Sequence, residues 1–372
     1  MKVGRPQNLQ NVRNKDKKND AMERRVANQS KTNPKAFFSY INSAKKTRAK
    51  IGPLKDENGS IVAESKKQAE ILNGFYASVF TQSTTDPPTK ERTTLKRKND
   101  IEINKEKVIK MIEGLKKNSA PGPDGILNRI MIELKEELAH PLAILYRKSM
   151  DEGQIPNEWR LSHVTPIFKS GSRMEPGNYC PVNLTSNPCK GMERIVNGEL
   201  VTYLDDGITT YSQYGFRKGR SCQSNLIDFL ETTTKWIDEG RTFDIIYLDF
   251  SKAFDKVCHK RLKTKLEAAG IEGRLKDWIK DWLEGRMQRL VVDGEVSKWA
   301  EVISSVIQGS VLGGTLFNLY INDIDDVIKS LIWKFADDTK AARLVETQED
   351  ANEFQADIDR MCEWAQKVGD EI

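Results

Sequence analysis

The sequence contains little of what zinc-binding or disulfide-linked scaffolds need. Its 372 residues include five cysteines and three histidines, and no two cysteines form a C-x-x-C pair. Closely spaced cysteines and histidines mark structural zinc sites, and paired cysteines mark secreted disulfide folds. The sequence argues against both, and we expect reduced thiols in an intracellular protein, nuclear or cytoplasmic.

Long apolar stretches are also missing. No uninterrupted run approaches the roughly 18 residues that a membrane-spanning helix requires. The opening segment MKVGRPQNLQNVRNKDKKND has no apolar stretch behind its basic start, so no secretory signal peptide is predicted. The length suits two or three domains, or one large α/β or α+β unit.

Positive charge is concentrated at one end of the chain. The formal net charge is +5, but residues 1–50 hold 14 Lys/Arg and 3 Asp/Glu, a net +11 that leaves −6 for the other 322 residues. A basic arm of this kind either contacts nucleic-acid phosphates or remains a solvated tail, and charge alone favours neither.

Periodicity predicts a mixed chain of helices and strands. Val108, Ile112 and Leu115 recur at helical spacing, so one face of their helix is expected to be buried. The segment SAPGPDGI at 119–126 contains two prolines and two glycines. It is therefore expected to form a fixed loop.

The strongest strand signal is FDIIYLDF at 243–250. Its near-continuous apolar character predicts a strand covered on both faces. The helix predicted before it, over 222–239, is expected to turn Leu226, Leu230 and Ile237 inward.

Three carboxylates stand where predicted strands leave the core. Asp249 ends the apolar stretch above, and Asp337 and Asp338 follow IWKFA in the same way. Antiparallel neighbours would bring them together, and such crowding favours cations between them. Hard oxygen ligands select Mg²⁺ alongside substrate phosphates, as in two-metal phosphoryl displacement. For each residue alone, the alternative is an ordinary aspartate at a strand end.

Six spaced motifs resemble the reverse transcriptases of non-LTR (LINE-type) retrotransposons, most like the Jockey and CR1 groups. In chain order they are SAPGPDGI (119–126), VTPIFKSGSRMEPGNYCPVNLTS (164–186) with KGMERIV (190–196), QYGFRKGRSCQSNL (213–226), YLDFSKAFDKVCH (247–259), QGSVLGGTLFNLYINDI (308–324) and FADDTK (335–340). This order makes the resemblance very specific, and it covers nearly the whole chain.

The resemblance implies an α+β fold, the fingers and palm of a right-hand polymerase, with an antiparallel palm sheet backed by helices. It divides the chain into a basic N-terminal extension (1–60), a helix with a Thr/Pro-rich linker (61–94), fingers (95–241), palm (242–345) and a C-terminal palm helix (346–372). The chain is expected to end before the family's thumb.

The resemblance also implies roles for individual residues. Asp249, Asp337 and Asp338 would be the catalytic carboxylates and bind two Mg²⁺ ions, or Mn²⁺. The expected nucleotide-binding residues are Lys169 at the γ-phosphate, Phe254 as the aromatic gate under the sugar, Phe250 and Ala253 through backbone N–H groups at the triphosphate, and Gln308 with Gly309 over the nucleotide and template. The alternatives are a solvated turn lysine for Lys169 and a core phenylalanine at a strand-to-helix turn for Phe254.

Template contacts are implied for Arg217, Lys218 and Arg220, which stand around two glycines in GFRKGRS, with a solvated basic loop as the alternative. A second Tyr-x-Asp-Asp pattern occurs at 203–206. It is not expected to bind metal, because it precedes the Asp249 strand and no apolar strand leads into it.

The sequence departs from the family at three positions. Cys180 stands where the family almost always has arginine, and a neutral thiol cannot replace a bidentate guanidinium. Ile307 and Gly314 stand where the pattern has prolines, so a looser loop is expected. Together with an end only 34 residues after Asp338, these departures indicate an incomplete, partly decayed copy.

The implied reaction is RNA-templated DNA synthesis, in which a primer 3′-hydroxyl attacks the α-phosphate of a dNTP and pyrophosphate leaves. The expected partners are an RNA template, a DNA primer or target and dNTPs, without a membrane; the oligomeric state is not predicted. One alternative is a non-catalytic RNA-binding relic of the same fold. Another is a group II intron-type maturase, whose site usually reads Tyr-Ala-Asp-Asp rather than Phe-Ala-Asp-Asp.

Overall fold

The computed structural model describes residues 51–81, 94 and 96–368. The elements below belong to the unit Pro53–Ile372. The predicted basic arm and nearly all of the Thr/Pro-rich linker lie outside the described residues. In the described part of the chain, no helix combines the length and apolar character needed to cross a membrane.

A three-stranded antiparallel sheet carries the predicted carboxylates. It consists of β5 (Phe243–Leu248), β10 (Asp338–Leu344) and β9 (Leu331–Phe335), in the order β5-β10-β9. The predicted antiparallel pairing is confirmed.

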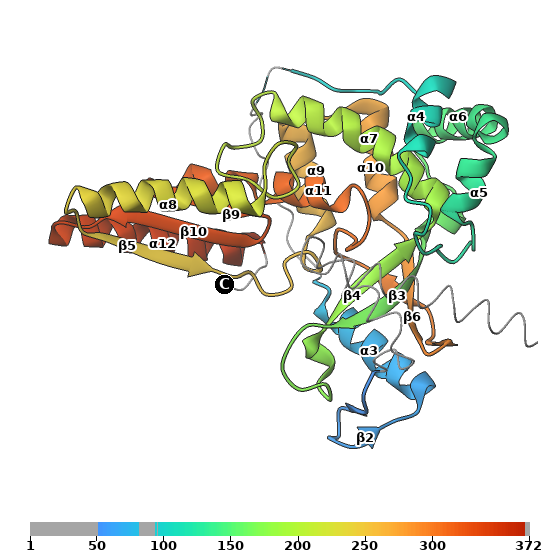
Figure 1. The fold of residues 1–372 in the computed structure, drawn as a ribbon, viewed down its shortest axis with the longest axis horizontal. Coiled ribbons are helices and arrows are strands. Elements are labelled where there is room, and N and C mark those ends of the chain that lie inside the picture. Colours follow the sequence, from blue (N-terminus) through green and yellow to red (C-terminus); the bar gives the residue numbers. More distant parts are fainter. Residues whose placement is uncertain (1–50, 82–93, 95, 369–372) are drawn as a thin grey trace, which may run out of the picture. The chain divides into compact units, whose positions relative to one another are not determined.

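Helices cover both faces of this sheet (Figure 1). α8 (Cys222–Asp238) packs on one face, where the ring centroids of Phe229 and Trp333 lie 5.3 Å apart. α12 (Gln348–Val368) packs against β10 on the other face. The sheet is therefore the middle layer of a helix–sheet–helix arrangement.

A second sheet has strands of mixed direction. It consists of β3 (Leu161–Phe168), β4 (Tyr179–Thr185), β6 (Arg286–Val292), β7 (Glu295–Val296) and β8 (Ala300–Val302). The order is β4-β3-β6-β7, with β8 also paired to β6; β3 is antiparallel to β4 and parallel to β6. α3 (Ser65–Val79) packs on β6, β7 and β8 and follows a short hairpin of β1 (Leu54–Lys55) and β2 (Ile61–Val62).

The remaining helices enclose the main hydrophobic core. They are α4 (Lys105–Glu113), α5 (Asn128–Glu133), α6 (Lys135–Glu152), α7 (Asn187–Asp205), α9 (His259–Ala268), α10 (Gly273–Leu283) and α11 (Gly313–Tyr320), with 3-10 helices η1 (Asn157–Arg160), η2 (Pro176–Asn178) and η3 (Asn322–Val327). Val108, Ile112 and Leu115 are buried in this core with Trp278 and Trp282, which confirms the face predicted from helical spacing.

The segment 119–126 forms a loop that packs on the junction between β4 and α7. A Cβ atom added to Gly122 would lie 2.5 Å from the carbonyl carbon of Thr185. Asn187 Nδ2 donates a hydrogen bond to the carbonyl oxygen of Ile126 at 2.7 Å. The predicted fixed loop is confirmed, and Gly122 is required by the close approach of the two backbones.

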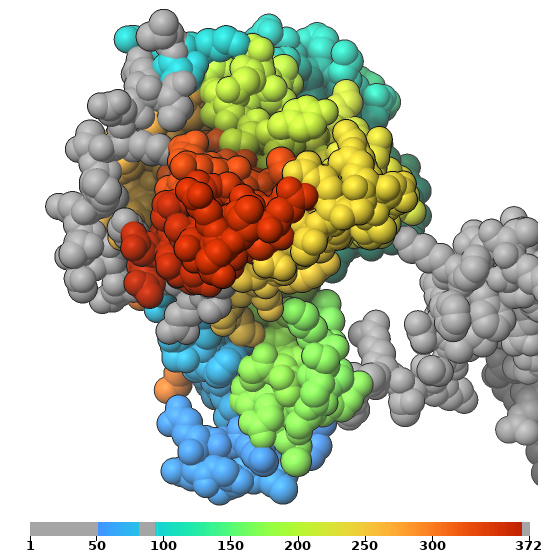
Figure 2. Space-filling model, turned by 90° about the vertical axis from the view of Figure 1, so that its left-hand side faces the viewer, coloured from blue at the N-terminus to red at the C-terminus, as the bar shows by residue number. Residues whose placement is uncertain are grey.

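The predicted inward face of α8 was wrong. Leu226 and Leu230 are each 47% exposed and Ile237 is 63% exposed. Figure 2 shows the outer side of α8, in yellow, at the molecular surface. The helix carries apolar residues on two stripes, and edge-to-face packing of Phe229 on Trp333 selects the other stripe for the sheet.

The prediction that the 243–250 strand is covered on both faces was also wrong. β5 ends at Leu248, lies at the edge of its sheet, and leaves Tyr247 66% exposed. An apolar run predicts a strand, but it does not show whether the strand is central or at an edge. Because β5 lies at the edge of the sheet, α8 and α12 do not cover all of its side chains.

Candidate active site

The three predicted carboxylates come to one end of the β5-β10-β9 sheet. Asp249 directly follows β5, Asp338 begins β10, and Asp337 lies in the turn from β9. Leu248 is paired with Thr339, so continuing this register by one residue sets Asp249 opposite Asp338. Paired residues of adjacent strands have side chains on the same face.

Electrostatics links these carboxylates with the predicted phosphate-binding lysine. Burial raises the pKa of the Asp337 carboxyl above its ordinary value, and the negative charges of Asp338 and Asp249 raise it further. A backbone hydrogen bond and the positive charge of Lys169 act in the opposite direction. The Asp337 carboxyl is therefore influenced by Lys169 as well as by its two neighbouring carboxylates, although Lys169 follows a strand of the other sheet.

The expected metal ligands are not close enough together in this structure to form a complete metal-binding site. Within the described ranges, no three histidine, cysteine, aspartate or glutamate side chains are grouped closely enough to hold a metal ion. The donor chemistry nevertheless fits a hard divalent cation, because carboxylate oxygens are its preferred ligands. The mutual repulsion at Asp337 is also of the kind that such a cation relieves.

Lys169 lies beside the exposed face of the β3–β4 hairpin. Along β4, buried residues alternate with half-buried ones, and Cys180 is among the half-buried. Cys180 is paired with Ile167, which is 52% exposed. Lys169 is two residues beyond Ile167 and so on the same face. Cys180 and Lys169 thus share the surface where the family's phosphate contacts were expected.

Three expected nucleotide-binding residues lie in the loop after β5. Phe250 and Ala253 are 3% and 2% exposed. Their side chains belong to the core, so a ligand could be reached only by their backbone. Phe254 is half-buried and stacks on Phe317 of α11, with ring centroids 4.3 Å apart and an interplanar angle of 12°. α11 therefore fixes the orientation of the predicted aromatic gate.

Gln308 and Gly309 lie against β4. Asn183 N–H donates to the carbonyl oxygen of Gln308 at 2.8 Å. Gly309 has a φ of +105°, and a Cβ added there would lie 2.6 Å from the carbonyl oxygen of Asn183. Glycine is required both by this backbone conformation and by the contact.

The carboxylate of Glu193 holds the other end of this loop. It is fully buried and accepts hydrogen bonds from the backbone N–H groups of Val311 at 2.6 Å and Leu312 at 3.3 Å. These two groups precede α11 directly. Sequence reasoning missed Glu193; the available signal was an acidic residue within the apolar pattern of KGMERIV.

The expectation of a loosened loop at Gly314 was wrong, because Gly314 is the second residue of α11. The ring of Phe216 occupies the space that a side chain at 314 would need: an added Cβ would lie 2.4 Å from its Cγ atom. Ile307 is 5% exposed and belongs to the main core. Both departures from the family pattern thus serve packing.

The three expected template contacts differ in their surroundings. Arg217 forms an ion pair with Asp205 at 2.8 Å and donates to the carbonyl oxygen of Thr210 at 2.9 Å. Arg220 lies over the ring of Tyr211, 4.0 Å from its centroid. Lys218 is exposed. Two of the three cations therefore already have contacts within the protein.

The second Tyr-x-Asp-Asp pattern lies at the C-terminal end of helix α7 and does not follow a strand. Its acidic residues pair with cations of the chain itself, Asp205 with Arg217 and Asp206 with Lys96. Neither contributes to the raised pKa of Asp337.

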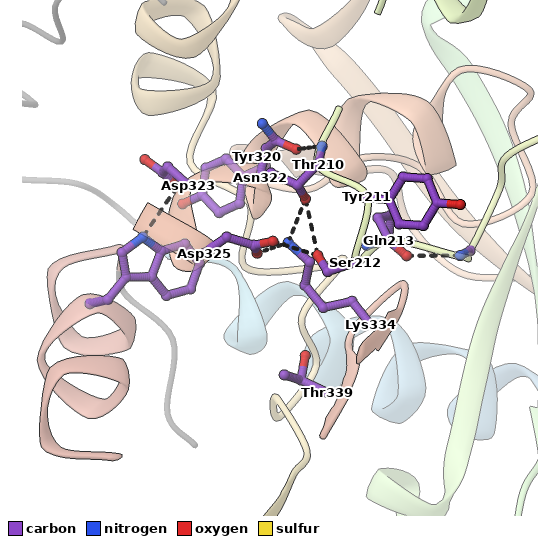
Figure 3. A network of polar contacts seen from close by, with 12 residues as sticks. Thr210, Tyr211, Ser212, Gln213, Tyr320, Asn322, Asp323, Asp325, Lys334 and Thr339 are labelled. Carbon is purple, nitrogen blue, oxygen red and sulfur yellow. Dashed lines mark hydrogen bonds and ion pairs between the residues drawn. The ribbon is translucent and has the colours of Figure 1, made fainter. Parts of the chain in front are cut away.

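A polar network beneath β9 was also missed (Figure 3). Lys334 is fully buried and forms an ion pair with Asp325 of η3, while its Nζ atom also donates to Thr210 Oγ1 at 3.2 Å. Its backbone N–H donates to the carbonyl oxygen of Ser212 at 2.8 Å. A lysine inside the apolar stretch IWKFA was the only sequence signal.

Comparison with known proteins finds relatives that are named as polymerases or polyproteins of transposable elements. The chain is 27% identical over 348 residues to the "Probable RNA-directed DNA polymerase from transposon X-element" of Drosophila melanogaster, covering 89% of this chain and 38% of that protein. It is 27% identical to the "RNA-directed DNA polymerase from mobile element jockey" of the same species, covering 71% of this chain and 30% of that protein. A type-1 R2 element polyprotein of Popillia japonica is 25% identical, over 60% of this chain and 30% of its own length.

The chain thus spans about a third of the length of the curated relatives it matches. The sequence model of the family described as "Reverse transcriptase (RNA-dependent DNA polymerase)" matches residues 167–372, which is more than half of the chain. This range contains Lys169, the three predicted catalytic carboxylates and the strands from β4 to β10. The chain belongs to the reverse transcriptase family.

Proposed function

We propose that this chain carries the polymerase centre of a non-LTR retrotransposon reverse transcriptase, the site of RNA-templated DNA synthesis. The observation that carries the proposal is that Asp249, Asp337 and Asp338 lie at one end of the antiparallel sheet, with Asp249 opposite Asp338 when the register is continued. The charges of Asp249, Asp338 and Lys169 all act on the half-buried Asp337 carboxyl. The family and the relatives' names support the reaction class. Fingers over about 95–241 and palm over 242–345 belong to the same proposal, as does a nuclear or cytoplasmic location.

Asp249, Asp337 and Asp338 would hold two Mg²⁺ ions, or Mn²⁺. When bound, such ions neutralise the charge that develops in phosphoryl transfer. The raised pKa of Asp337 supports this assignment, because negative charges gathered around a half-buried carboxyl favour a cation.

The other site residues would hold the nucleotide and orient it. Lys169 would bind a phosphate of the dNTP, and the backbone N–H groups of Phe250 and Ala253 would bind the triphosphate. The ring of Phe254, supported by Phe317, would lie under the sugar. Gln308 and Gly309 would lie over the nucleotide and the template.

An RNA template and a DNA primer or target are the proposed partners. Lys218 is exposed and would bind phosphate directly. Arg217 would act on the template only by leaving Asp205, or indirectly by holding the basic loop. The guanidinium of Arg220 would bind phosphate while its stack on Tyr211 holds it in place.

The test is Mg²⁺-dependent binding of a fluorescent dNTP to the full chain. Asp249→Asn, Asp337→Asn and Lys169→Ala should each weaken binding by at least about tenfold, because charged contacts to a ligand are worth roughly 1.5–3 kcal/mol. Asp206→Asn is the matched control, since it alters an aspartate of the second Tyr-x-Asp-Asp pattern and should leave binding unchanged. Equal binding by all four variants would contradict the proposal.

A non-catalytic RNA-binding relic is the second candidate. Cys180 favours it, because this position lies on the exposed hairpin face near Lys169 and lacks the family's guanidinium. RNA binding by the wild-type chain without any Mg²⁺-dependent dNTP binding would support the relic over the polymerase.

A further inference from the structure

The residue before Asp337 has an unusual backbone. Ala336 has a φ of +57°, in the left-handed region that L-residues with a Cβ atom rarely adopt. Such a conformation costs on the order of 1–2 kcal/mol and persists only where neighbouring groups enforce it. The torsions of Ala336 set the direction in which the chain enters Asp337.

The side-chain amide of Gln213 bonds both polar groups of Ala336. Gln213 is 1% exposed. Its Oε1 accepts from the N–H of Ala336 at 2.9 Å and from the N–H of Gly215 at 2.8 Å, while its Nε2 donates to the carbonyl oxygen of Ala336 at 3.5 Å. One side chain therefore bonds the left-handed residue from both sides of its Cα atom.

The neighbours of Gln213 hold it in register with β9. Tyr214 N–H donates to the carbonyl oxygen of Lys334 at 2.8 Å, next to the parallel bridge between Gln213 and Lys334. Gly215 lies so close to the turn that an added Cβ would be 2.4 Å from the Ala336 nitrogen. Figure 3 shows Gln213 in this network beside Ser212 and Lys334.

We infer that Gln213 is a positioning residue for Asp337: it enforces the left-handed Ala336 and thereby directs the Asp337 carboxylate toward Asp249 and Asp338. The inference rests on the proposed function for its metal-binding consequence. Its structural half, that Gln213 enforces the turn, stands on the hydrogen bonds alone.

The test combines two measurements on the full chain: hydrogen exchange at the Ala336 amide, and binding of Mg²⁺ alone by calorimetry. Gln213→Met keeps the side-chain length and removes the side-chain hydrogen bonds to Ala336 and Gly215. Exchange at Ala336 should become about tenfold faster, and Mg²⁺ should bind roughly 10- to 100-fold more weakly, as when groups that orient metal ligands are removed.

Ser212→Ala is the matched control. It removes a hydroxyl of the same network, bonded to Asp325, but no contact to Ala336. Exchange at Ala336 and Mg²⁺ affinity should both match the wild type. Unchanged exchange in Gln213→Met, or an equal loss of Mg²⁺ affinity in both variants, would overturn the inference.

Asp337→Asn separates this inference from the proposed function. It should lose Mg²⁺ affinity while the Ala336 amide stays protected. If Asp337→Asn binds Mg²⁺ like the wild type, the metal site is wrong, and Ala336 exchange still decides whether Gln213 enforces the turn.

Should Gln213→Met fail to fold, the wild-type chain supplies the decision. Its Ala336 amide must then exchange as slowly as the paired amides of β10, and exchange at the rate of an exposed loop would overturn the inference.

Discussion

At the residue scale, Gly314 shows how packing can reverse an intrinsic preference. Alanine normally stabilises a helix by roughly 0.5–1 kcal/mol relative to glycine. In α11, however, the new Cβ would meet the ring of Phe216, which is itself held in a left-handed conformation with a φ of 54°. Gly314→Ala should therefore destabilise the protein by about 1–3 kcal/mol, measured by urea unfolding.

Gly198 provides the matched control. It lies within α7, is exposed, and has no atom within 4 Å of an added Cβ. Gly198→Ala should stabilise the protein by roughly 0.5–1 kcal/mol. Equal effects of the two substitutions would show that the Phe216 ring does not occupy the space at Gly314.

We expect the buried carboxyl of Asp255 to make the stability of the protein depend on pH. Burial raises the pKa of this carboxyl from 3.8 to about 6, and the charge of Lys252 only partly opposes the shift. The folded state thus binds the proton more tightly than the unfolded chain does. The stability that this proton contributes is complete below about pH 4 and is lost as the pH rises through about 6.

Asp255→Asn should remove this dependence. At pH 7.5 the free energy of unfolding of the variant, measured with urea, should exceed that of the wild type. The difference should be up to about 3 kcal/mol, because each pKa unit is worth 1.36 kcal/mol. At pH 4 the difference should vanish. Parallel stability profiles of the two proteins between pH 4 and 7.5 would contradict the prediction.

At the scale of elements, the β3–β4 hairpin presents Cys180 and Lys169 on one face. Cys180→Arg adds a planar, bidentate cation beside the lysine proposed to bind phosphate. The Kd for Mg²⁺–dNTP should fall by roughly tenfold, since charge-assisted bidentate contacts are among the stronger hydrogen bonds. Fluorescence titration with a labelled dNTP measures the change.

Val182→Arg separates position from charge. Val182 lies on the same face of β4 but is paired with Thr165, two pairs further from Lys169 than Cys180 is. It should improve dNTP binding much less than Cys180→Arg. An equal gain from both would mean that any added positive charge on the hairpin suffices.

The elements also show how far sequence reasoning reaches. Strand ends beside Asp249 and Asp337 were predictable, because apolar runs that stop at a carboxylate are local patterns. The exposed face of α8 was not, because two apolar stripes compete and only the position of Trp333 decides between them. Gln213 and Glu193 were missed for a related reason: the backbone groups of Ala336 and Val311 that they bond lie more than 100 residues away in the sequence.

At the scale of the whole molecule, charge is divided between two regions of the sequence. Residues 1–50 carry a net +11 and the other 322 residues a net −6. Because each phosphate contact with a single strand contributes about −0.7 to the log–log salt slope, a nucleic-acid-binding arm should dominate that slope. Deletion of residues 1–50 should flatten it by several units, measured by anisotropy with single-stranded RNA across a salt series.

Lys218→Ala in the full chain calibrates this last prediction. It removes one exposed cation of the basic loop and should change the slope by less than about one unit, the size of a single phosphate contact. A slope unchanged by the deletion, beside a measurable effect of Lys218→Ala, would identify the arm as a solvated tail. RNA binding would then depend on the 53–372 unit alone, despite the net negative charge of the sequence after residue 50.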